Sequence, residues 1–268
     1  MKYFDSHCHL QFPQYEKDLS EVLERMQEQG VGGIVVGTDL ETSRAGIALA
    51  EKHDFLWASV GLHPNDKGDF DLPAGKAGIS KYEELAKHPK VVAIGECGLD
   101  YYRPTDVNDE VKRKQKNILK EQMRLAGELD LPLIIHSRPS RGTQDAYQDL
   151  ISILTKAKQT FPKLRGDIHF FVGGVFEARA LVALGFTISF TAVITFARDY
   201  DEVIKAIPLP SILSETDAPY VAPASRRGER NDPLAVEEVA GKIALIRGED
   251  SEQVRATLVA NAKRLFSI

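Results

Sequence analysis

The chain has 268 residues, of which 43% are hydrophobic and 27% are charged, a composition typical of a globular protein with a packed core rather than of a disordered chain. Its formal net charge of −5 excludes a broadly basic surface that coats nucleic acid, so any nucleic acid must be bound locally. No apolar run approaches the ~20 residues of a membrane helix, and the N-terminus lacks the pattern of a signal peptide. We therefore expect a cytoplasmic protein without a membrane partner; the sequence carries no signal for its oligomeric state.

Short runs rich in β-branched residues alternate with helical patterns from one end of the chain to the other. The predicted strands are Tyr3–Ser6, Gly33–Val36, Leu56–Val60, Val91–Ile94, Leu133–Ile135, Asp167–Phe170, Thr187–Phe190 and Ile212–Ser214. Helical patterns such as Leu19–Gln29 and Val111–Leu129 lie between them. This alternation predicts repeated strand-helix units with a parallel sheet.

Eight such units match a single (β/α)₈ TIM barrel, a fold of about 250 residues. No linker or shift in composition divides the chain, so we predict one domain over residues 1–268. A doubly wound open sheet gives the same alternation, but the polar residues described next favour the barrel, because catalytic residues of barrels come from the C-terminal ends of several strands. The widest irregular stretches each follow a strand and are expected to form site loops: Pro64–Gly78, Arg138–Gly142 and Ala218–Pro233.

Two histidines end the first predicted strand, in the segment Asp5-Ser6-His7-Cys8-His9. Strand alternation places His7 and His9 on the same face, with Cys8 directed away. Two convergent imidazoles are a common beginning of a metal site, although a satisfied pair in the core or at the surface gives the same pattern. The pair therefore needs further ligands to count as a metal site.

Further candidate ligands lie at the ends of later strands, and they are Glu96, His136, His169 and Asp217. Each has an ordinary alternative, since His169 alone is typical of a core histidine and Asp217 alone of a helix cap before Pro219. Together, four histidines and two carboxylates at equivalent strand ends can surround two cations that share one carboxylate. We therefore predict two divalent metal ions, and these ligands suit Zn²⁺, Mn²⁺ or, less readily, Mg²⁺.

The whole chain resembles the TatD family of metal-dependent deoxyribonucleases, which belongs to the amidohydrolase superfamily of barrels. The motifs that carry the resemblance include FDSHCHL at 4–10, VGLHP at 60–64, GECGLDYY at 95–102, IIHSR at 134–138, SETDAPY at 214–220 and RGERNDP at 227–233. Two segments depart from the usual pattern. The residues Phe170–Gly174 after His169 differ, so that loop is expected to be reshaped, and Ser137–Arg141 carries an apparent insertion, so no arginine there is assigned a role.

The resemblance implies how the six ligands divide between the cations. One cation would be held by His7, His9, Glu96 and Asp217, and the other by Glu96, His136 and His169. Glu96 would thus bridge the two cations, and Asp217 would also orient the attacking water and accept its proton.

The resemblance also implies three residues that contact or support the substrate. His63 is expected to contact the substrate phosphate, and Asp100 and Arg230 are expected to act as supporting groups near the site. Each has an alternative: a structural histidine before Pro64, a turn cap before Tyr101, and a solvated loop charge for Arg230.

The implied activity is that of a 3′→5′ exonuclease on DNA, acting on single strands or frayed ends in repair or degradation. One alternative is a deacylase that removes D-amino acids from tRNA, because the same metal site serves either bond. Another is a non-catalytic protein that binds metal or nucleic acid, and the complete set of six ligands argues against it.

Overall fold

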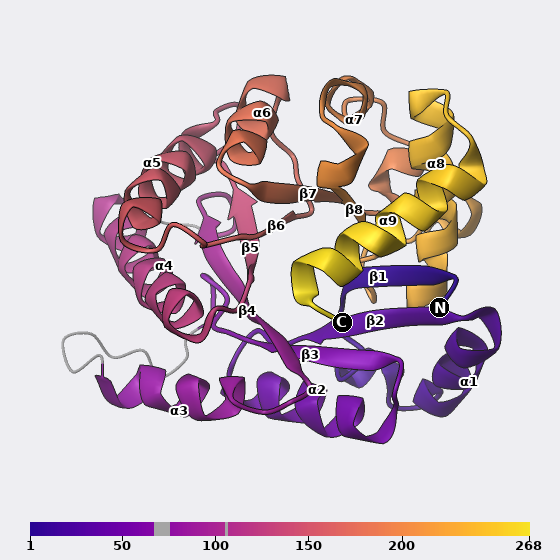
Figure 1. The fold of residues 1–268 in the computed structure, drawn as a ribbon, viewed down its shortest axis with the longest axis horizontal. Coiled ribbons are helices and arrows are strands. Elements are labelled where there is room, and N and C mark those ends of the chain that lie inside the picture. Colours follow the sequence, from indigo (N-terminus) through magenta and orange to yellow (C-terminus); the bar gives the residue numbers. More distant parts are fainter. Residues whose placement is uncertain (67–75, 105–106) are drawn as a thin grey trace.

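The structure is a computed structural model that describes residues 1–66, 76–104 and 107–268. Eight strands form one sheet in the order β1 to β8, each parallel to the next, and the helices surround them (Figure 1). The predicted (β/α)₈ barrel is confirmed. None of the helices within the described ranges is long and apolar enough to cross a membrane.

The strands alternate with helices along the whole chain. The strands are β1 (Tyr3–Cys8), β2 (Val31–Val36), β3 (Leu56–Val60), β4 (Val91–Asp100), β5 (Leu133–Arg138), β6 (Gly166–His169), β7 (Phe186–Phe190) and β8 (Ile212–Ser214). The helices are α1 (Leu19–Gln29), α2 (Leu40–Lys52), α3 (Lys76–Ala86), α4 (Asp109–Leu129), α5 (Asp145–Thr160), α6 (Val175–Ala183), α7 (Asp201–Ala206), α8 (Val236–Arg247) and α9 (Ser251–Phe266).

Several predicted boundaries need correction. β4 continues six residues beyond the predicted end at Ile94, through a segment that lacks the β-branched residues on which the prediction relied. α4 begins at Asp109, because the side chain of Asn108 caps the backbone NH groups of Glu110 and Val111. β6 ends at His169, since Phe170 adopts a left-handed conformation with φ of 45°.

The predicted bounds of the site loops also need correction. Residues 67–75 of the predicted stretch Pro64–Gly78 lie outside the described residues, and α3 already begins at Lys76. Arg138 is the last residue of β5 rather than part of a loop. The stretch Ala218–Pro233 contains the short 3₁₀ helix η4 (Ala224–Arg226) and ends where η5 (Pro233–Ala235) begins.

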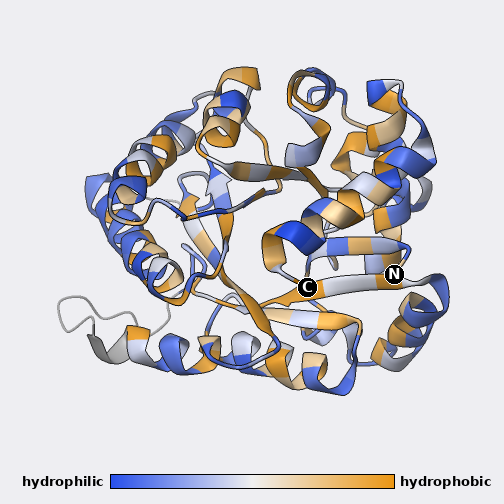
Figure 2. Ribbon diagram, viewed as in Figure 1, coloured by the Kyte–Doolittle hydropathy of each residue, from blue (hydrophilic) through white to orange (hydrophobic). Residues whose placement is uncertain are grey.

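Hydrophobic residues are concentrated in the strands and on the helix faces turned toward them, while hydrophilic residues predominate on the outer faces of the helices (Figure 2). The last turns of α9 close one end of the barrel. Leu265 and Phe266 of α9 pack in a buried cluster with Phe4, Ile134 and Leu213 from three strands. The candidate ligands lie at the opposite end, where the strands terminate.

The barrel closes where the segment after β8 meets β1. Cys8 forms a parallel bridge with Ala218, the backbone NH of Asp217 donates to the carbonyl oxygen of His7 at 2.9 Å, and that of His9 donates to the carbonyl oxygen of Ala218 at 2.7 Å. The backbone of three candidate ligands is therefore held by the closure itself.

Two β-bulges lie beside candidate ligands. The pairing of β1 with β2 shifts between Asp5 and Cys8, and the pairing of β4 with β5 shifts between Ile94 and Cys97. A bulge inserts one unpaired residue and redirects the neighbouring side chains, which is why bulges are frequent at active sites. The bulge in β4 contains Glu96.

Candidate metal centre

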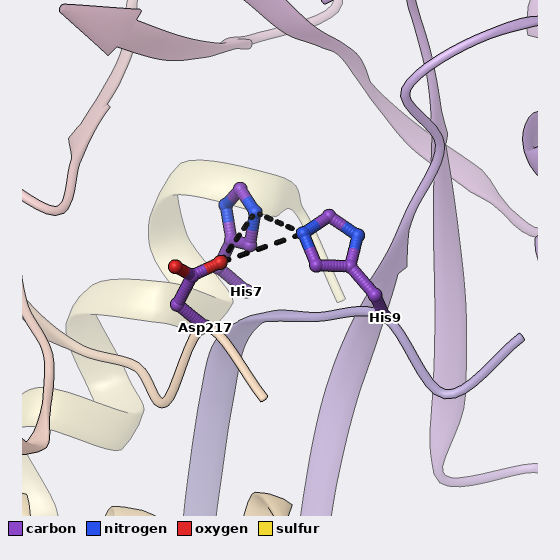
Figure 3. A group of neighbouring side chains, drawn as sticks. All are labelled: His7, His9 and Asp217. Atoms are coloured by element: carbon purple, nitrogen blue, oxygen red, sulfur yellow. Dashed lines mark hydrogen bonds and ion pairs between the residues drawn. The ribbon is translucent and has the colours of Figure 1, made fainter. Parts of the chain in front are cut away.

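The predicted ligands meet at the end of the barrel where the strands terminate. His7 lies in β1, His9 follows it, and Asp217 follows β8. The Nε2 atoms of His7 and His9 are 3.2 Å apart, and they lie 3.8 Å and 3.5 Å from Asp217 Oδ1 (Figure 3). The thiol of Cys8 is directed away and donates to the carbonyl oxygen of Ile34. The convergence of His7 and His9 is confirmed.

Glu96 lies between two groups of histidines, and each of its carboxylate oxygens lies close to one group. Glu96 Oε2 lies 3.5 Å from Nε2 of His7 and 3.9 Å from Nε2 of His9. Glu96 Oε1 lies 3.1 Å from both Nδ1 of His136, in β5, and Nε2 of His169, in β6. A single buried carboxylate thus joins the two halves of the ligand set.

The outer nitrogens of His9 and His136 are held by hydrogen-bond acceptors. His9 Nδ1 donates to the carbonyl oxygen of Val36 at 2.9 Å, and His136 Nε2 donates to Asp100 Oδ2 at 3.1 Å. Because neutral imidazole has one N–H, these bonds fix the tautomer of each ring. The inner nitrogens, His9 Nε2 and His136 Nδ1, then carry lone pairs directed into the centre.

His169 has a similar partner that the sequence analysis did not single out. Its Nδ1 lies 3.3 Å from Oε1 of Glu215, a fully buried carboxylate. Glu215 is held in turn by the backbone NH of Phe170 at 2.6 Å and by the hydroxyl of Ser189 at 2.9 Å. Glu215 stands two residues before Asp217 in the SETD motif, which is the signal that could have identified it.

This arrangement is suited to divalent cations. Lone pairs of imidazole nitrogens and oxygens of buried carboxylates approach one another within 3.1–3.9 Å, an arrangement that is repulsive without positive charge between them. Imidazole nitrogen and carboxylate oxygen are ordinary ligands of Zn²⁺ and Mn²⁺. Among the described residues, four groups of three ligand atoms lie within 4.8 Å of one another. Two of these groups match the predicted halves of the centre, namely His7, His9 and Asp217, and Glu96, His136 and His169.

The electrostatics of the protein without cations agree with this description. Burial raises the pKa of Glu96, but the positive charge of His169 and hydrogen bonds from His136 and His169 outweigh this effect, so the pKa lies well below its usual value. Burial lowers the pKa of His136, yet its hydrogen bonds to Asp100 and Glu96 raise it overall. These directions show that the surroundings of Glu96 favour positive charge.

A cavity of about 720 Å³ opens over the ligands. His63, which follows β3, lines it, with Nε2 3.6 Å from Glu96 Oε1, and burial lowers its pKa to about 3, so its ring is neutral at physiological pH. Arg103 and Arg138 also line the cavity, together with aromatic side chains that include Phe12 and Tyr220. The structure therefore places His63 beside the candidate ligands, and its contact with the substrate phosphate stays a prediction.

Asp100 lies behind His136 and does not line the cavity. Its carboxylate is fully buried and accepts hydrogen bonds from the backbone NH groups of Tyr102 and Arg103 and from the side chain of Asn65. The turn-cap alternative therefore holds, and the carboxylate also orients His136. Gly98 allows this close approach of β4 and β5, because a side chain there would overlap the carbonyl oxygen of His136.

Arg230 is not brought to the cavity. Its guanidinium group forms two hydrogen bonds with the carboxylate of Asp18, at 2.7 and 2.6 Å, and stacks on the ring of Tyr15. It lines a separate cavity of about 370 Å³. The arginines that line the cavity over the ligands are Arg103 and Arg138. Arg103 comes immediately after the GECGLDYY motif, and Arg138 ends the IIHSR motif, where the apparent insertion prevented the assignment of a role.

Buried imidazole and carboxylate ligands at the C-terminal ends of barrel strands are the arrangement of a metal-dependent hydrolase. The family model of the TatD related DNases matches residues 4–267, and the chain belongs to this family. The protein is thus a TatD-family metal-dependent hydrolase.

Known relatives cover the chain along its whole length. It is 38% identical over 271 residues to the uncharacterized metal-dependent hydrolase YabD of Bacillus subtilis (strain 168), covering 99% of each chain. It is 34% identical over 274 residues to the 3′-5′ ssDNA/RNA exonuclease TatD of Escherichia coli (strain K12), again covering 99% of each. The crystal structure of YJJV, a TatD homolog from Escherichia coli K12, superimposes with a TM-score of 0.85 at 30% identity, covering 100% of this chain and 98% of that chain.

Proposed function

We propose that residues 1–268 form one catalytic domain that hydrolyses phosphodiester bonds of nucleic acid. The specific activity proposed is that of a 3′→5′ exodeoxyribonuclease acting on single-stranded DNA or frayed ends, in repair or degradation within the cytoplasm. Its support comes from the buried ligand set, the cavity above it, and relatives named as 3′-5′ ssDNA/RNA exonucleases.

The observation that carries this proposal is the division of the Glu96 carboxylate between two groups of histidines. It supports a bridging role for Glu96 between two divalent cations, one held with His7, His9 and Asp217 and the other with His136 and His169. Two such cations would polarise the phosphoryl oxygens and make a bound water more acidic, as phosphodiester hydrolysis requires.

The side chains around this centre would provide the remaining chemistry. Asp217 lines the cavity, and this position supports a role of its carboxylate in orienting the attacking water and accepting its proton. His63 also lines the cavity, and its neutral imidazole can donate a hydrogen bond to a phosphate oxygen. We assign Asp100 the role of positioning His136, and we transfer the charged phosphate contact from Arg230 to Arg103.

The deciding experiment is a hydrolysis screen of oligonucleotides labelled at the 3′ or the 5′ end, with Mg²⁺, Mn²⁺ or Zn²⁺ added, beside a D-aminoacyl-tRNA control. The proposal expects stepwise loss of nucleotides from the 3′ end of single strands. Deacylation of the tRNA without hydrolysis of DNA would establish the deacylase alternative instead.

A further inference from the structure

An exposed pair of side chains lies beside the wall of the cavity, between the loops that follow β7 and β8. Phe196 is 38% exposed, and the guanidinium carbon of Arg227 stands 3.9 Å from the centre of its ring. The two loops are joined nearby, because the backbone NH of Ala224 donates to the hydroxyl of Thr195 at 2.8 Å. The loop that carries the partly exposed ring is therefore tied to the loop that carries Arg227.

The charge of Arg227 is available to a ligand. Within residues 1–66, 76–104 and 107–268, no carboxylate forms a salt bridge with Arg227. The neighbouring Arg226 is paired with the carboxylate of Asp232 at 2.9 Å, and Arg198 is paired with that of Asp201. Of these neighbouring arginines, Arg227 is the one whose charge is not already neutralised.

The pair lies just outside the cavity. Val193 and Tyr200, on either side of Phe196 in the sequence, line the cavity, whereas Phe196 and Arg227 do not. A cavity of about 720 Å³ is of the size that holds a small ligand. A strand with its end at the metal ligands would therefore have to leave the cavity across its rim.

We propose that Phe196 and Arg227 form a binding subsite for single-stranded nucleic acid outside the catalytic cavity. The inference rests on the proposed function and adds the path of the strand. An unpaired base stacks on the exposed face of Phe196, and Arg227, which covers part of the ring, binds an adjacent phosphate. A duplex has no free base faces along its length, so the subsite selects single strands.

The test compares Phe196→Leu, Phe196→Ala and Arg227→Ala with two exposed controls at the other end of the barrel, Leu245→Ala near the end of α8 and Lys163→Ala before β6. The probe is a labelled oligothymidylate of about 12 nucleotides, within the ~4–16 nucleotides that such sites cover. Its phosphorothioate linkages resist hydrolysis, and binding is measured by fluorescence anisotropy with the cation that supports activity. Thymidine dinucleotide and bis(p-nitrophenyl) phosphate serve as short substrates, and circular dichroism confirms folding.

We expect Phe196→Ala and Arg227→Ala to weaken binding of the long strand by about 5- to 100-fold, with Phe196→Leu close to Phe196→Ala. Arg227→Ala should also reduce the slope of log affinity against log salt concentration by about 0.7, the loss of one phosphate contact. These variants should hydrolyse the short substrates at the rate of the unmodified protein. The two control variants should bind the long strand and hydrolyse the short substrates as the unmodified protein does.

The inference is overturned if the variants bind the long strand with normal affinity, or if hydrolysis of the short substrates falls by the same factor as binding of the long strand. It is also overturned if a duplex binds as tightly as the single strand. These results differ from failure of the proposed function, in which the unmodified protein hydrolyses no oligonucleotide with any cation.

Discussion

The Nε2 atom of His136 lies 3.1 Å from the Oδ2 atom of Asp100, on the side of the ring away from the ligand centre. Asp100 is itself fixed by two backbone NH groups and is fully buried. The carboxylate therefore determines both the orientation of the ring and the nitrogen that carries its proton.

Changing Asp100 to alanine should weaken metal binding at the half of the centre that contains His136. The ring loses its acceptor, and loss of such a partner typically costs 10- to 100-fold in metal affinity or activity. Metal affinity measured by competition with a chelator checks this expectation, with Asp145→Ala at the start of α5 as a control for loss of a carboxylate. Unchanged metal affinity in a folded Asp100→Ala protein would show that the contact has no positioning role.

Removing divalent cations should abolish hydrolysis while leaving the protein folded. The barrel core and the packing of α9 against the strands supply the burial that stabilises the fold, so secondary structure should persist. The melting temperature should fall, because a ligand that binds the folded state stabilises it. Far-UV circular dichroism and activity are measured on a dialysed sample whose metal content has been verified; full activity in that sample would contradict the proposed mechanism.

The carboxylates of Asp217 and Glu96 should respond differently to replacement by amides. Asp217→Asn keeps one coordinating oxygen but cannot accept a proton near neutral pH, so we expect most of the metal to remain while turnover falls by about 10²- to 10⁴-fold. Glu96→Gln should lose metal together with activity, because a neutral amide bridges two cations poorly. Metal analysis and single-turnover rates distinguish the two. An Asp217→Asn protein with a normal rate would remove Asp217 from the mechanism.

Replacing His63 or Arg103 by alanine should weaken substrate binding without loss of metal. Both line the cavity and neither is assigned to a cation, and a lost hydrogen bond to a charged phosphate corresponds to about a 10-fold rise in KM or more. Arg230→Ala is the matched control, because its guanidinium group is engaged by Asp18 in a separate cavity. A rise in KM for Arg230→Ala equal to that for Arg103→Ala would restore the role that the family resemblance implies for Arg230.

The sequence predicted the barrel and the convergence of the ligand set because both follow from periodicity. A strand end is visible in the sequence, and all strand ends of a parallel barrel meet at one face. The bulge that contains Glu96 was not predictable in this way, since it depends on the register between β4 and β5.

The charged residues of the loops were less predictable, because their roles depend on tertiary partners. Arg230 and Arg103 look alike in the sequence, yet the carboxylate of Asp18 holds the first away from the cavity that the second lines. Glu215 was not predicted for the same reason, since it follows β8 and its contact is with His169 at the end of β6.

Closure of the barrel also determines when the centre can exist. The backbone of Asp217 is hydrogen-bonded to that of His7, so one half of the ligand set contains residues that are 210 positions apart in the chain. During synthesis on the ribosome, a chain from which Asp217 has not yet emerged has His7, His9 and Glu96 without the carboxylate that follows β8. The nascent protein therefore has an incomplete centre until Asp217 has emerged, and a fragment that ends before this residue would remain incomplete however well its first strands fold.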